Sequence, residues 1–192
     1  WHPEVSERQL HGRVVTLPCG TRIAGLGGVF RGAVWYPKDQ QAPKFRNREA
    51  HARVTPRQDR WQGGVHLKHW SSIYPDEVEQ LATLQADILI THEAPGYHDH
   101  GFKELDSLAR RMGVRMTVHG HQHDNIDSSA HWEAQGFQSF GVGLRGVMAV
   151  DGFDDFLGSV ERSSHGHKPT HERDPFEGMP GSIELSALKL NN

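Results

Sequence analysis

The apolar positions along the chain predict two short strands separated by a helix. Ile88-Leu89-Ile90 is a continuous aliphatic run, typical of a buried strand, and Val114, Met116 and Val118 alternate with polar residues. Between these runs apolar residues recur at helical spacing and stop at Gly113, a residue type common just beyond a helix: Phe102, Leu105, Leu108, Ala109 and Met112. The order strand, helix, strand predicts two parallel neighbouring strands and an α/β fold.

The N-terminal part of the chain is predicted to hold two strands, 13–17 and 22–30, joined by a turn at residues 18–20. The second strand is rich in glycine but does not form a phosphate-binding loop, because Phe30 stands where the third glycine of that motif would be. Its glycines are expected to permit close packing or a bulge. Cys19 is the lone cysteine, so we expect no internal disulfide, a reducing, cytoplasmic setting and a buried thiol.

A second helix is expected to begin at Pro75, because proline is favoured at the first helical position and two acidic residues follow it in the first turn. Its apolar face is formed by Val78, Leu81, Ala82 and Leu84. Further along, residues 136–142 and 144–150 are predicted to form a hairpin around Gly143. Residues 161–192 contain few apolar positions, which predicts a flexible polar tail.

Histidines follow both of the central predicted strands. His92 comes directly after the first strand, and His119, His121 and His123 lie two residues apart at the end of the second. In extended backbone these three side chains would point the same way. Because the carboxyl ends of parallel strands lie at one edge of a sheet, we expect His92 to be their neighbour. Neutral imidazole is a common metal ligand, so this edge is a candidate metal site; the alternative is a polar turn with solvated histidines.

The segment Thr91-His92-Glu93-Ala94-Pro95, followed later by Gly120-His121-Gln122-His123, resembles the last two motifs of the calcineurin-like metallophosphoesterases. The resemblance implies a fold of two mixed sheets packed face to face, with helices outside and a pair of Mn, Fe or Zn ions at one edge. It implies that His92 and His121 bind one ion and His123 the other. The implied reaction is the hydrolysis of phosphate mono- or diesters by a metal-activated hydroxide.

The earlier motifs of this family are absent from the sequence. There is no Asp-x-His, no Gly-Asp and no Gly-Asn-His, which in the family supply the remaining metal ligands and the acid for the leaving group. The resemblance covers roughly residues 17–151, so we interpret 1–160 as a partial domain that lacks its N-terminal portion. Because the chain begins at Trp1, we expect that an N-terminal segment is missing.

A partial site would have limited chemistry. Three imidazoles could hold at most one ion with an open position, so we expect this chain alone to be weak or inactive. The alternative function is a non-catalytic half-domain that binds a partner or is completed by one, and self-association would cover its exposed surfaces.

Other histidines are less distinctive. His98 and His100 follow the His92 loop, so they and His119 are candidates to touch substrate or to support the metal ligands; the alternative is that they are ordinary loop and strand-end histidines. His66 and His69 are expected to be solvated loop residues. A second Gly-His-like pattern, His165-Gly166-His167, has no strand before it and is interpreted as accidental.

Residues 31–64 are polar, with basic side chains among aromatic ones. Such a pattern could bind nucleic acid, but we favour a long, partly mobile loop with solvated charges. A formal net charge of −3 with both signs mixed gives no nucleic-acid footprint, and no polybasic patch for a membrane surface. No apolar stretch approaches the length of a membrane span.

Overall fold

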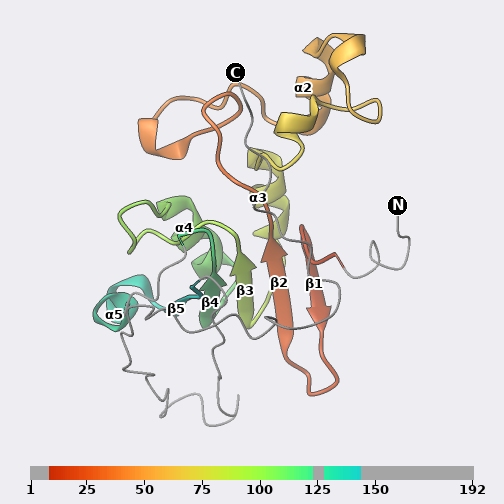
Figure 1. Ribbon diagram of the computed structural model, residues 1–192. Coiled ribbons are helices and arrows are strands. Elements are labelled where there is room, and N and C mark those ends of the chain that lie inside the picture. The colour runs from red at the N-terminus through yellow and green to blue at the C-terminus, as the bar shows by residue number, and fades with distance from the viewer. Residues whose placement is uncertain (1–8, 123–127, 144–192) are drawn as a thin grey trace, which may run out of the picture. The chain divides into compact units, whose positions relative to one another are not determined.

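The computed structural model describes residues 9–122 and 128–143, which all lie within one unit of the chain, residues 1–149. In this part of the chain five strands form one sheet in the order β1-β2-β3-β4-β5 (Figure 1). The strands are β1 Arg13–Thr16, β2 Arg22–Leu26, β3 Ile88–Thr91, β4 Met116–His119 and β5 Gln138–Gly141. β1 is antiparallel to β2, and all other neighbouring pairs are parallel. The α/β prediction and the parallel pairing of β3 with β4 are confirmed.

Four helices accompany the sheet in the described ranges: α2 Arg48–Val54, α3 Pro75–Leu81, α4 Lys103–Arg111 and α5 Trp132–Gln135. α3 begins at Pro75 as predicted, and the Glu77 carboxylate accepts a hydrogen bond from the Tyr74 N–H at 3.0 Å. α4 ends in a left-handed turn at Gly113, whose φ is +67°. The Val114 N–H bonds the Ala109 carbonyl there, which satisfies a free end of the helix as predicted.

The core lies on one face of the sheet. Ala24 and Leu89 are register partners on β2 and β3, and Leu26 is on the same face two residues along. These side chains pack with α3 and α4 in a single buried cluster that includes Val78, Leu81, Leu105, Leu108, Ala109 and Met112. Leu84, which was expected to join them, lies beyond the end of α3 and is 39% exposed.

The opposite face of the sheet is apolar and partly open. Residues on this face alternate with the core positions, and Val15 and Ile90 are 44% and 41% exposed. Ile23, Ile88 and Val118 on the same face are partly exposed. Crossovers between parallel strands have one hand, so strands added in sequence order place their connecting helices on the same side. In the described part of the chain, the strand order β2-β3-β4-β5 therefore places the connecting helices on the core side of the sheet, and on the opposite face Met116 and Phe140 are nevertheless buried.

The region between β2 and α3 differs from the prediction. Residues 31–64 were expected to be a long loop, but they contain α2 and short 3₁₀ turns at Pro37–Asp39 and Arg57–Asp59. The Asn47 side chain caps α2 by accepting from the Ala50 N–H at 2.8 Å. Arg48 then holds α2 to the rest of the fold by donating to Glu77 at 2.6 Å and to the Trp70 carbonyl at 2.8 Å.

Two further expectations concern the hairpin of β1 and β2. β1 and β2 pair as predicted, but β2 ends at Leu26 and not at residue 30. Gly28 packs closely beyond it, since a Cβ there would lie 2.6 Å from the Ser71 carbonyl oxygen. The expectation that Cys19 is buried is wrong, because the tight turn at residues 18–20 leaves it exposed.

Several sequence predictions lie outside the described residues. They are the second strand of the hairpin (144–150), the polar tail (161–192), and the boundary at 160. The first strand of that hairpin is present as β5, which buries Phe140. A second sheet, which the family resemblance implies, is not among the elements in the described ranges. Within those ranges, no helix has both the length and the apolar character that a membrane span requires.

Candidate metal centre

The ends of β3 and β4 bring His92 and His121 together. Thr91 and His119 are register partners at the last position of the two strands, so the residues that follow leave the same edge of the sheet. His92 Nε2 and His121 Nδ1 lie 2.6 Å apart, and the two rings meet edge to face at 81°. Both side chains are exposed. The prediction that these two sites are neighbours in space is confirmed.

The 2.6 Å separation of the two nitrogens suits a hydrogen bond, in which the rings share one proton. A slightly larger separation would suit a metal ion bound by both nitrogens. Two imidazole nitrogens bound tetrahedrally to one Zn²⁺ at about 2.0–2.1 Å lie roughly 3.3 Å apart. The ring nitrogens would therefore have to separate by several tenths of an ångström, which rotation of two exposed side chains allows. Among residues 9–122 and 128–143, no group of three or more His, Cys, Asp or Glu side chains is placed to hold a metal ion. His123, predicted as a further ligand, lies outside the described residues.

His119 does not point along with His121. The chain leaves β4 at His119 and turns, and His121 adopts a left-handed backbone conformation with φ of +64°. The His119 ring is buried, with Nε2 2.6 Å from the Tyr97 hydroxyl and Nδ1 3.3 Å from the Gly120 carbonyl. Because a carbonyl only accepts, Nδ1 carries the proton and Nε2 accepts from Tyr97. The expectation of parallel histidine side chains is therefore wrong for this pair.

Tyr97 was not singled out from the sequence. Besides its bond to His119, its ring lies 6.2 Å from the ring of His98 and 6.0 Å from that of His131. It thus connects the His92 loop to β4 and to the turn before α5. A tyrosine inside a histidine-rich loop at a strand end is the only signal that could have indicated it.

The predicted supporting residues take different places. His98 is buried, and its Nδ1 accepts from the backbone N–H of His100 at 3.0 Å. His100 is exposed, with its ring 5.6 Å from that of His98. His98 is thus a structural residue of the turn, and His100 is the more accessible of the two.

Two buried carboxylates fix the loop that carries His92. Asp106 of α4 accepts from the Gly96 N–H at 2.9 Å and from the Gln135 amide at 3.3 Å. Glu93 accepts from the Phe30 N–H at 3.2 Å, which ties the loop to the segment after β2. Both carboxylates are at most 8% exposed, so they stabilise the loop and are not available to solvent.

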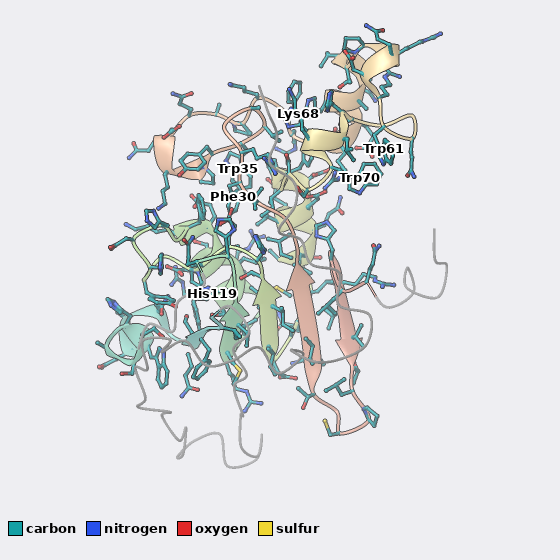
Figure 2. The ribbon with its side chains drawn as sticks, viewed as in Figure 1. Phe30, Trp35, Trp61, Lys68, Trp70 and His119 are labelled. Atoms are coloured by element: carbon teal, nitrogen blue, oxygen red, sulfur yellow. The ribbon has the colours of Figure 1, made fainter. Side chains whose placement is uncertain are left out.

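Aromatic residues from the segment after β2 pack on the other end of the same loop. Phe30 lies 4.4 Å from Phe102 and 5.1 Å from Trp35, and Figure 2 shows Phe30 and Trp35 side by side. Lys38 crosses over the Phe102 ring and donates to the Asp99 carbonyl at 2.8 Å. The segment after β2 therefore borders the loop that follows His92.

The chain is similar to a protein of Haemophilus influenzae that is described as uncharacterized. The two are 41% identical over 152 residues, which is 79% of this chain and 65% of the relative. This chain therefore spans less than two thirds of the length of that relative. No protein-family model and no solved structure matches the chain.

Proposed function

We propose that the chain forms part of a metal-dependent phosphoesterase of the calcineurin-like type. The observation that carries the proposal is the contact of His92 Nε2 with His121 Nδ1 at the carboxyl edge of two parallel strands. Two imidazoles at such an edge fit part of a divalent-metal site. When bound there, divalent ions would supply Lewis-acid activation of water and of the phosphoryl group.

The residues around this pair would orient and confine the reaction. His92 and His121 would hold one ion, and Tyr97 with His119 would support the turn that carries His121. The Glu93 and Asp106 bonds would keep the His92 loop fixed while substrate enters from the exposed side of the pair. His123 remains the proposed ligand of a second ion.

The open face of the sheet supports the proposal that further chain completes the fold. Parallel sheets are normally covered on both faces, and here Val15 and Ile90 on the apolar face opposite the core are exposed. A second sheet packed on that face would give the two-sheet architecture that the resemblance implies. The greater length of the relative agrees with a longer parent protein.

The same open face favours a second candidate function. A half-domain without a complete metal site would serve as a binding module if a partner chain covers Val15 and Ile90. The two functions differ in whether the chain, once complete, turns over a phosphate ester.

A phosphatase assay separates the two functions. We expect this chain to hydrolyse p-nitrophenyl phosphate and its diester at close to background rate in Mn²⁺, and a chain extended upstream to the length of the relative to hydrolyse one of them. His121→Ala should lower that activity at least about a hundredfold, because it removes a metal ligand. His11→Ala, an exposed histidine elsewhere, is the control. An inactive extended chain that nevertheless binds a partner would favour the module.

A further inference from the structure

A second cluster of histidines lies away from the His92–His121 pair. A pocket of about 240 Å³ is lined by His51 of α2, by His66, Lys68 and His69 from the segment before α3, and by Asp59. Figure 2 shows Lys68 well apart from His119. One water needs roughly 10–15 Å³ by this measure, so the pocket has room for a ligand of several atoms.

The proton of His51 can be placed from its hydrogen bond. Its Nδ1 lies 2.8 Å from the hydroxyl of Tyr74, which is fully buried. Burial raises the pKa of Tyr74 to about 12, so the hydroxyl keeps its proton at neutral pH. His51 Nδ1 is the hydrogen-bond partner that the described residues offer to this buried O–H. His51 Nδ1 therefore accepts, and its Nε2 carries an N–H.

His66 is fixed in the same way. Its Nδ1 accepts from the backbone N–H of Lys68 at 3.1 Å, so its proton is also on Nε2. A metal ion binds to a nitrogen lone pair, and the Nδ1 lone pairs of His51 and His66 already accept hydrogen bonds. The pocket consequently offers N–H donors and the exposed Lys68 ammonium, which suits an anion better than a cation.

The surroundings of His69 also favour an anionic ligand over a cationic one. Burial lowers the pKa of His69, and the charges of Lys68 and Arg31 lower it further, as do His51 and His66 when they are protonated. The Nδ1 of His69 is buried and has no hydrogen-bond partner in the described part of the chain. Among the groups that line the pocket, Lys68 is therefore the charged donor, and the Asp59 carboxylate also lines it.

From this geometry we infer that the pocket formed by His51, His66, Lys68 and His69 is an oxyanion site that takes a phosphate group. Imidazole N–H groups and the lysine ammonium donate to its oxygens, and charge-assisted bonds of this kind are the stronger ones. The site does not depend on the His92–His121 centre or on the function proposed for it. Its ligand is either free phosphate or the phosphate group of an ester.

Calorimetric titration of the metal-free chain with inorganic phosphate, in a chelator, tests the site. We expect saturable binding of one phosphate, weakened about tenfold or more in Lys68→Ala, since one charge-assisted bond is lost. Lys68 is exposed, so this variant should fold normally. Lys44→Ala, which changes another exposed lysine of the same segment, should bind phosphate as the wild type does. Equal affinity in wild type and Lys68→Ala, or no saturable binding, would overturn the inference.

Two further measurements sharpen the result. Nitrogen-15 spectra of the imidazoles should show the proton on Nε2 in both His51 and His66, and a proton on Nδ1 in either would contradict the donor arrangement. A parallel titration with phenyl phosphate identifies the source of the ligand. Tighter binding than that of inorganic phosphate would assign the site to a phosphate ester, and weaker binding would assign it to the free ion.

Discussion

At the scale of single residues, Gly101 controls the shape of the loop that follows His92. A Cβ at this position would lie 1.7 Å from the Pro95 carbonyl oxygen, so any side chain must displace the backbone. We expect Gly101→Ala to reduce the free energy of unfolding by roughly 2 kcal/mol or more, as strained core-facing substitutions do. Urea denaturation measures this, with Gly32→Ala as the control because its Cβ would meet nothing within 4 Å. Equal stability of the two variants would show that the loop backbone shifts to make room for the Cβ without a loss of unfolding free energy.

Single residues also show what sequence reasoning could reach at the site. The approach of His92 to His121 was predictable, because parallel strands place their carboxyl ends at one edge. The burial of His119 was not, since it depends on Tyr97 reaching across from another loop. The left-handed conformation at His121 is likewise a tertiary outcome, because histidine has no intrinsic need for a positive φ.

At the scale of elements, an ion pair joins the start of β2 to the start of β3. The Asp87 carboxylate accepts from the Arg22 backbone N–H at 2.8 Å and from its guanidinium at 3.2 and 3.3 Å. These bonds lower the pKa of Asp87 below its ordinary value, so the carboxylate stabilises the folded state above its unfolded-state pKa. That contribution is lost as the pH falls through the lowered folded-state pKa.

Asp87→Asn should therefore cost about 1 kcal/mol at pH 7 and less at pH 3, where the wild type has begun to lose the same charge. Unfolding in urea at both pH values measures the difference. The matched control is Asp39→Asn, an exposed carboxylate that should change stability by no more than about 0.5 kcal/mol. If Asp87→Asn lowered the free energy of unfolding equally at both pH values, the hydrogen-bonding shape of the Asp87 side chain, and not its charge, would join the two strands.

Elements with a clear apolar period were predictable, and α2 was not. β3, α4 and β4 each bury apolar residues at the spacing of their structure, and their order determines the pairing. α2 has seven residues, and His51 is its buried one. α2 is stabilised by the Asn47 cap and by contacts of Arg48 with residues distant in the sequence. No local apolar pattern therefore predicts this helix.

At the scale of the whole molecule, the apolar face with Val15 and Ile90 should make the chain self-associate. We expect sedimentation to show association that rises with protein concentration, and Ile90→Lys to reduce it by placing a charge on that face. Thr83→Lys, which adds the same charge outside the sheet, is the control. A compact monomer at all concentrations would mean that this face is already covered, and it would remove the argument for a second sheet.

The central claim of this account is that His92 and His121 together hold a divalent metal ion. Elemental analysis of the purified chain and of its His92→Ala/His121→Ala variant, after equilibration with Zn²⁺ or Mn²⁺ and removal of the excess, tests it most directly. We predict about one ion per chain for the wild type, by the donor count of a single site, and loss of that ion in the variant. Equal metal content in the two proteins would contradict the claim and leave the two imidazoles as partners in a hydrogen bond alone.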